Sequence, residues 1–289
     1  MRPVRVLVAL LLAALALTAL SACGSGEDRL SELQQRAEQT RRKLEARADR
    51  LRRRVREVLA NLEQAVPRAT PKTQSPATRG RTEQNEIEGF LTDVLGSVDR
   101  YWTRTLSAAG RPEPRVGYVW LPPGQVVGTG CGAPADENAA FYCPDDDTIY
   151  FSEGLAARLW QGVARDFPGE RAGYGHAVGD FGVAYVVAHE YAHNVQNELG
   201  LFRLGQQQLG AKPFELQADC MAGLWGNSVY REGKLQPGDV EEAMSTATAA
   251  GDFDYKNAQH HGTPEERRAA WLAGYRSGNP TTCGRYVPT

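Results

Sequence analysis

Two histidines four residues apart, with a glutamate directly after the first, are the residues of this sequence best placed to do chemistry. They are His189, Glu190 and His193, in the stretch Val187–Gln196. On an α-helix both histidines lie on one face about one turn apart, so both imidazoles can bind the same metal ion. Glu190 then lies beside the metal. Hydrolysis by a zinc-activated water needs this arrangement, because the metal lowers the pKa of the water and a carboxylate takes its proton.

The residues around this motif predict a buried helix rather than a surface helix with two unrelated histidines. Apolar residues recur at helical spacing from Phe181 to Leu199, which is the pattern of a face packed against a core. Val183, Val186 and Val187 make the first half apolar nearly all round. Buried histidines need polar partners, and a metal ion supplies one.

A second segment, Pro213–Cys220, carries two carboxylates one helical turn apart, Glu215 and Asp219. A catalytic zinc site has three protein ligands and an open fourth position, so one of these carboxylates is expected on the metal. The other can accept a hydrogen bond from a ligand imidazole. We assign Glu215 to the metal and Asp219 to the imidazole. A solvent-facing pair is disfavoured by the apolar opposite face, which consists of Phe214, Ala218, Met221 and Trp225.

Residues 1–23 have the pattern of a secretory signal, with Arg2 and Arg5 before the apolar run Val6–Leu20. The run is shorter than the roughly 20 residues that a membrane-spanning helix needs. Leu20-Ser21-Ala22-Cys23 resembles a bacterial lipobox, which implies cleavage before Cys23 and a lipid on that residue. A plain secreted protein and an uncleaved anchor are the alternatives. The expected location is the outer face of the cell membrane.

Residues 24–66 predict a helical stalk, because an apolar stripe repeats every seven residues at Leu30, Ala37, Leu44, Leu51 and Val58. Arg47 and Arg54 interrupt the stripe, so a lone helix and self-association through a coiled coil both fit. Residues 41–56 carry nine Arg or Lys against two acids, which fits either a solvated face or attraction to an anionic surface. The net charge of −2 argues against nucleic acid as a partner of the whole chain.

Residues 67–82, rich in proline and cations, predict an extended linker, and residues 83–289 the catalytic domain. Within this domain a small sheet is followed by helices, an α+β arrangement. Expected strands are 115–121, 125–129 and 148–152. Expected helices are 83–109, 154–167, 180–199, 213–232, 237–250 and 264–277.

At this point the chain resembles a known family. His-Glu-x-x-His-x-Val-Gln followed by Glu-Leu-Gln-Ala-Asp-Cys-x-Ala-Gly-x-Trp is similar to the neutral zinc metallopeptidases of bacteria, which are similar to the gluzincin group of zincins. The resemblance extends from Cys131 to Trp271. It implies a zincin-like fold, Zn²⁺ on His189, His193 and Glu215, Glu190 as the base and a peptide or protein substrate. Ala192 and Asn194 replace a glycine and a histidine that are frequent in the family, and neither position is a ligand.

The developing oxyanion of peptide hydrolysis usually needs one further donor. His261, in the Gln259–Thr263 segment, is our candidate, with His260, Tyr255 and Tyr191 behind it. A capped turn is the alternative for this segment. We expect a substrate chain to lie along an edge strand, and we assign that edge to 148–151. His176 is expected to be a loop residue.

Four cysteines remain beside Cys23, an even number that suits disulfides in an exported chain. Three pairings exist, and we prefer Cys131–Cys143, closing a turn-rich loop, and Cys220–Cys283, tying the C-terminal tail to the helix of Glu215. Two hypotheses for the whole chain follow. One is a surface-tethered metallopeptidase, and the other is a non-catalytic zinc-binding lipoprotein for assembly or metal handling. Glu190 favours the enzyme, because a structural zinc site has no use for a base.

Overall fold

The computed structural model describes residues 35–36, 38–43, 46, 84–165, 167–201 and 209–286. The chain divides into two compact units, Met1–Arg50 and Leu51–Thr289. In the first unit the described residues are helical and exposed, and Glu38 pairs with Arg42 one turn later at 3.5 Å. The predicted signal segment with Cys23, the linker and most of the stalk lie outside the described residues.

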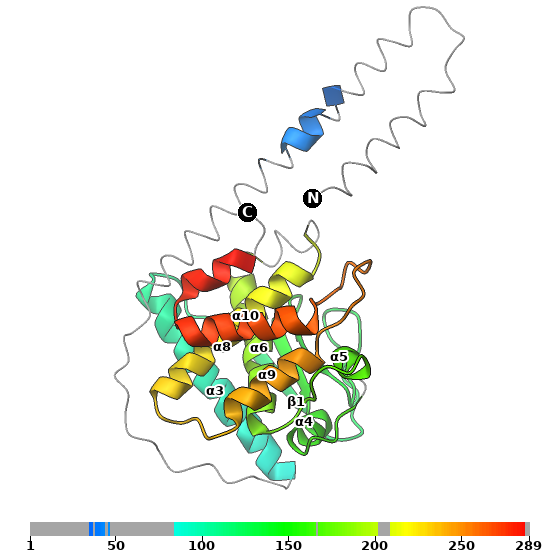
Figure 1. Ribbon diagram of the computed structural model, residues 1–289, viewed down its shortest axis with the longest axis vertical. Coiled ribbons are helices and arrows are strands. Elements are labelled where there is room, and N and C mark those ends of the chain that lie inside the picture. Colours follow the sequence, from blue (N-terminus) through cyan, green and yellow to red (C-terminus); the bar gives the residue numbers. More distant parts are fainter. Residues whose placement is uncertain are drawn as a thin grey trace, which may run out of the picture. The chain divides into compact units, whose positions relative to one another are not determined.

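The described part of the second unit is mostly helical, with one small sheet (Figure 1). Its helices are α3 (Gln84–Ala108), α4 (Glu153–Trp160), α5 (Pro168–Arg171), α6 (Asp180–Glu198), α8 (Lys212–Arg231), α9 (Asp239–Ala249), α10 (Pro264–Ser277) and the 3-10 helix η1 (Pro280–Tyr286). Its strands are β1 (Gly117–Leu121), β2 (Ala140–Cys143) and β3 (Thr148–Ser152). This composition fits the predicted α+β class. Over the residues described, the chain contains no helix with the length and hydropathy to span a membrane.

The sheet has the order β1-β3-β2, with β1 parallel and β2 antiparallel to β3. The prediction that 148–151 forms the edge was therefore wrong, because β3 pairs on both sides and β2 is an edge. β2 was not predicted. The strand expected at 125–129 is also wrong, since it forms only an isolated bridge between Val127 and Ala135, and Val126 is 66% exposed.

Most helix boundaries follow local chemistry. α10 begins and ends at the predicted residues, because Thr263 and Glu266 form a capping box at its start and Gly278 ends it in the left-handed conformation. α4 ends at Trp160 and not at the predicted residue 167. Gly162 follows with φ of 65°, and Val163 N donates to Arg158 O in a closing turn.

α6 lies in the core, packed against α3, α8, α9 and α4, and 15 of its 19 residues are buried. α8 and α10 pack against each other, and at two glycines their backbones are closer than a side chain would allow. A Cβ on Gly223 of α8 would lie 2.1 Å from Trp271 O, and one on Gly274 of α10 would lie 1.9 Å from Cys220 O. Because the two helices are so close, a side chain of α10 can reach the part of α8 that packs against α6.

Both preferred disulfides are present. Cys131–Cys143 joins the loop before β2 to the end of that strand. Cys220–Cys283 joins α8 to η1, and both of its cysteines are completely buried. The bridges therefore fasten an edge of the sheet and the C-terminal turn to the body of the unit.

Candidate active site

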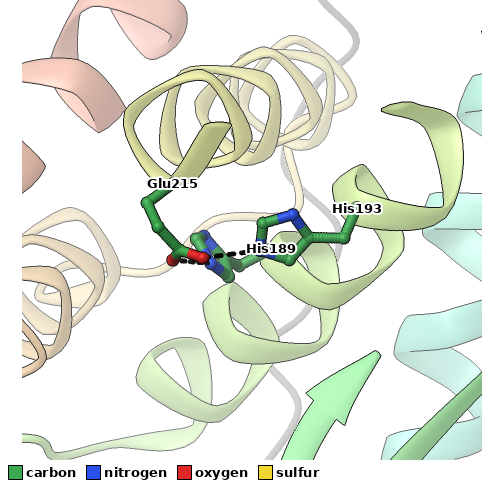
Figure 2. A group of neighbouring side chains, drawn as sticks. All are labelled: His189, His193 and Glu215. Atoms are coloured by element: carbon green, nitrogen blue, oxygen red, sulfur yellow. Dashed lines mark hydrogen bonds and ion pairs between the residues drawn. The ribbon is translucent and has the colours of Figure 1, made fainter. Parts of the chain in front are cut away.

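The two histidines of the motif lie on one face of α6 and meet a carboxylate from α8 (Figure 2). Their ring centroids are 4.8 Å apart. Nε2 of His189 lies 3.2 Å from Oε2 of Glu215, and Nε2 of His193 lies 3.3 Å from Oε1. One potential ligand atom from each of the three residues lies within 4.8 Å of the others.

These separations fit a zinc ion. Ligand atoms about 2.0–2.1 Å from a tetrahedral zinc lie about 3.3–3.4 Å from each other. The observed 3.2 and 3.3 Å, each from a histidine nitrogen to a different oxygen of Glu215, place the three side chains close enough to share one ion. Two imidazoles and one carboxylate are also the donor set of catalytic zinc, with a fourth position left for water or substrate. The structure thus brings together the three residues predicted as ligands.

Asp219 lies on the opposite side of the His189 ring from Glu215. Its Oδ1 is 2.9 Å from Nδ1 of His189, so the carboxylate contacts this imidazole as predicted from the sequence. Burial lowers the pKa of His189, but the carboxylates of Asp219 and Glu215 outweigh burial and raise it to about 10. Burial raises the pKa of Asp219, but Arg267 and His189 outweigh this effect and hold it at about 2. The Asp219 carboxylate is therefore ionised.

Arg267 is the residue of this site that sequence reasoning missed. It comes from α10 and is only 4% exposed. Its Nε and Nη2 lie 2.8 and 2.9 Å from the two oxygens of Asp219, and Nη2 also lies 3.2 Å from the hydroxyl of Tyr185. Tyr185 donates to Asp219 at 2.6 Å. Arg267 belongs to the segment of family resemblance, but nothing in its spacing linked it to Asp219.

Glu190 is 8% exposed and lines the same cavity as the three candidate ligands. Its Oε2 accepts a 2.9 Å hydrogen bond from the backbone N–H of Tyr142 in β2. Burial raises the pKa of Glu190, and the two histidines oppose this shift without cancelling it. A carboxylate with a raised pKa is a better proton acceptor near neutral pH.

His261 also lines this cavity, and 46% of its side chain is exposed. Asp252 holds it, accepting from the backbone N–H of His261 at 2.8 Å and lying 3.2 Å from its Nδ1. The other oxygen of Asp252 binds Nδ1 of His260. Burial raises the pKa of Asp252, but the N–H of His261 and the side chain of His260 lower it to about 2.

The remaining sequence candidates lie away from the reacting groups. Tyr191 donates its hydroxyl to Asp99 of α3, and Tyr255 is 65% exposed. His176 is a loop residue, as expected, and contacts Glu170 at 2.6 Å.

The cavity has a volume of about 360 Å³, within the range of small-ligand sites. Its lining includes the apolar residues Leu155, Leu159, Phe167 and Val186, here called the apolar wall. Glu190, the three candidate ligands and Arg267 also line it. Val186 precedes Glu190 by one turn of α6, so the apolar wall begins directly beside the carboxylate.

A buried helix pair that presents two imidazoles and a carboxylate, with a further carboxylate in the same cavity, is an arrangement that could hold one metal ion. Comparison with known proteins gives the family. Residues 53–286 match the family described as "Putative neutral zinc metallopeptidase". The chain belongs to this family, and Zn²⁺ is the cofactor that the family implies.

Three relatives illustrate the similarity. Uncharacterized protein YpfJ of Escherichia coli (strain K12) is 30% identical over 236 residues, which cover 75% of this chain and 77% of the relative. Uncharacterized protein Mb2605 of Mycobacterium bovis and Uncharacterized protein Rv2575 of Mycobacterium tuberculosis (strain H37Rv) are each 35% identical over 216 residues, covering 66% of this chain and 67% of each relative. No solved structure shows significant similarity to the chain.

Proposed function

We propose that this protein is a zinc-dependent peptidase in which His189, His193 and Glu215 hold the metal and Glu190 is the general base. The observation that carries the proposal is the burial of Glu190 in the cavity that the three candidate ligands line. Zn²⁺ at this position supplies Lewis-acid polarisation and a lowered pKa for a bound water. A site that held zinc only for structure would be closed by a fourth protein ligand and would not need this carboxylate.

Glu190 would take a proton from the attacking water and pass it to the leaving amine. The N–H of Tyr142 fixes one oxygen of Glu190, which leaves the other free to face the reacting atoms. His261, anchored through Asp252, would donate a hydrogen bond to the developing oxyanion.

The arrangement supports a zincin-like fold. The motif helix α6 lies beside a sheet whose edge strand β2 contributes Ala140, Phe141 and Tyr142 to the cavity, and the third ligand comes from the next long helix. A peptide substrate would lie along β2, with an apolar side chain against the wall formed by Leu155, Leu159, Phe167 and Val186. A charged side chain there would be buried without a partner, at a cost of free energy.

We further propose that lipid on Cys23 tethers the protein to the outer face of a bacterial membrane. The lipobox-like Leu20–Cys23 and the two disulfides support an exported chain. Cells grown with a palmitate analogue are expected to label the wild type and not Cys23→Ser. An unlabelled wild type would remove the anchor.

Digestion of a proteome-derived peptide library tests the peptidase. The wild type is expected to cleave peptides, and Glu190→Gln to lose activity by about 10²–10⁴-fold while keeping its zinc. Gln is nearly isosteric and can still accept from Tyr142 N, so the loss reports on the base. Equal and undetectable cleavage by both proteins, each loaded with zinc, would instead favour a non-catalytic zinc-binding lipoprotein.

A further inference from the structure

The outer nitrogen of His193 faces a buried amide. Nδ1 of His193 lies 2.9 Å from Oε1 of Gln196, three residues further along α6. Gln196 is completely buried. His193 is thus contacted through Nδ1 by an amide, whereas His189 is contacted through Nδ1 by the Asp219 carboxyl group.

A backbone carbonyl determines which way the Gln196 amide points. Nε2 of Gln196 donates to Phe214 O at 2.9 Å and to Oε1 of Gln217 at 3.1 Å. A carbonyl oxygen can only accept, so the NH₂ group of Gln196 must face Phe214. Its oxygen therefore faces His193. Because that oxygen can only accept as well, Nδ1 of His193 must carry a hydrogen, which leaves Nε2 directed at Glu215.

The amide of Gln217 is oriented in the same sense as that of Gln196, with its oxygen toward the preceding group and its nitrogen toward a carbonyl. It is completely buried, it accepts from Gln196 through Oε1, and its Nε2 lies 3.5 Å from the backbone oxygen of Cys283. Because the oxygen of Cys283 can only accept, the nitrogen of the Gln217 amide must face it. The oxygen of Gln217 therefore faces Gln196, as the donor of Gln196 requires. Cys283 lies in η1 and is bonded to Cys220, three residues beyond Gln217 on α8.

We propose that Gln196 and Gln217 are positioning residues for His193. They form a relay of two oriented amides that fixes a hydrogen on Nδ1 of His193 and connects this imidazole to the C-terminal turn held by Cys220–Cys283.

The relay has a specific physical task. His193 comes from α6 and Glu215 from α8, and these two ligands must keep the 3.3 Å separation of their donor atoms. Gln196 spans the same two helices, binding His193 on one and Phe214 O, the residue before Glu215, on the other. A buried network in which each amide has its partners is rigid. Groups that orient a metal-binding imidazole in this way change metal affinity when they are removed.

The inference rests on the proposed zinc site, but its tests do not depend on peptide cleavage. The direct test is nitrogen-15 NMR of histidine-labelled, zinc-loaded full chain. We expect His193 to carry hydrogen on Nδ1 and to bind zinc through Nε2. Zinc on Nδ1, or failure of the wild type to bind zinc, would overturn the relay. A wild type that binds zinc and cleaves nothing would refute only the peptidase.

Zinc affinity by chelator competition is the second test. Gln196→Met keeps the volume of the side chain and removes its hydrogen bonds, so zinc is expected to bind about 10–100-fold more weakly. Gln217→Met acts through Gln196 and is expected to weaken binding by a smaller factor, up to about 10-fold. Affinity within about twofold of wild type for Gln196→Met would overturn the proposal. If this variant does not fold, NMR of the wild type still decides.

Asn227→Leu is the matched control. Asn227 also lies on α8 and donates its amide to a carbonyl, Tyr275 O at 2.6 Å, but it is twelve residues, or about 18 Å, beyond Glu215. Its zinc affinity and the spectrum of its cobalt-substituted form are expected to match wild type, whereas Gln196→Met changes both. Replacing Cys220 and Cys283 by serine releases the far end of the relay and should weaken zinc binding about as much as Gln217→Met. Unchanged affinity would overturn the part assigned to Cys283.

Discussion

Oδ1 of Asp219 lies 2.9 Å from Nδ1 of His189, while the other ring nitrogen of His189 faces Glu215 at 3.2 Å. The imidazole lies between the carboxylate of Asp219 and that of Glu215, the proposed metal ligand. Asp219→Asn removes the charge that orients the ring, so zinc should bind about 10–100-fold more weakly in chelator competition. Asp99→Asn is the control. Asp99, like Asp219, accepts a hydrogen bond from a tyrosine hydroxyl of α6, that of Tyr191, but it contacts none of the three candidate metal ligands. Equal affinities for the two variants would contradict this role.

Arg267 neutralises a buried charge. Removing one partner of a buried ion pair costs about 3–5 kcal/mol, because the other charge stays buried and unpaired. Arg267→Met should therefore lower the free energy of unfolding by about this amount in urea titrations with chelator present. Asp219→Asn combined with Arg267→Met should lose less than the sum of the single losses. Additive losses would show that the 2.8 and 2.9 Å contacts carry little of the stability.

His261 should affect turnover and not metal binding. Its side chain lines the cavity but none of its contacts reaches the three candidate ligands. His261→Ala is expected to lower kcat by about 10²–10³-fold, the usual effect of removing an oxyanion donor. Zinc content, measured by elemental analysis on the same samples, should stay at the wild-type level. An unchanged kcat would exclude the role.

The apolar wall should select the substrate side chain. Val186 lies one turn before Glu190 and faces the cavity. Val186→Phe fills part of that space, so cleavage of library peptides should shift from large to small apolar residues beside the scissile bond. Val163→Phe makes the same change at a residue that is 51% exposed and outside the cavity, and its preference should equal wild type. If the cleavage preference shifts in both variants, or in neither, the apolar wall does not select the substrate side chain.

Glu242 gives a pH dependence away from the metal site. Its pKa is raised to about 7, mainly by burial; the N–H of Phe181 opposes this shift, and Asp180 and Asp239 add to it. The folded state therefore binds more protons than the unfolded state between about pH 4.5 and 7, so Glu242 lowers stability as pH rises through this window. Glu242→Gln should match wild type near pH 4 and unfold at higher urea concentration at pH 8. Glu241→Gln, at an exposed neighbouring residue, should not show this pH-dependent gain.

Local patterns predicted the helices that carry the site. The periodicity of 180–199 and the capping residues before α10 act within a few residues, so the sequence alone reveals them. β2 was missed because Ala140–Cys143 is short and lies between turn residues, and only its pairing with β3 makes it a strand. The same limit misplaced the edge of the sheet, since strand neighbours are decided by non-local contacts.

The candidate ligands could be found because a helix fixes the spacing of His189 and His193, and Glu215 and Asp219 repeat that spacing. Arg267 could not be found in this way. It is 78 residues from His189 and reaches Asp219 across the close contact between α8 and α10. The relay of Gln196 and Gln217 needed the positions of two carbonyl oxygens, which no side-chain pattern encodes.

If a peptide binds along β2 as proposed, the hydrogen bond from Tyr142 N to Glu190 would also determine how it aligns with the strand. Neighbouring residues of a strand direct their backbone groups to opposite sides. Since the N–H of Tyr142 reaches α6 and not β3, the backbone groups of Ala140 point the same way, toward the cavity. A peptide added to β2 would pair at Ala140, because the N–H of Tyr142 already donates to Glu190, the proposed base. Two residues of one short strand, Ala140 and Tyr142, would thus link the alignment of the substrate to the position of the Glu190 carboxylate.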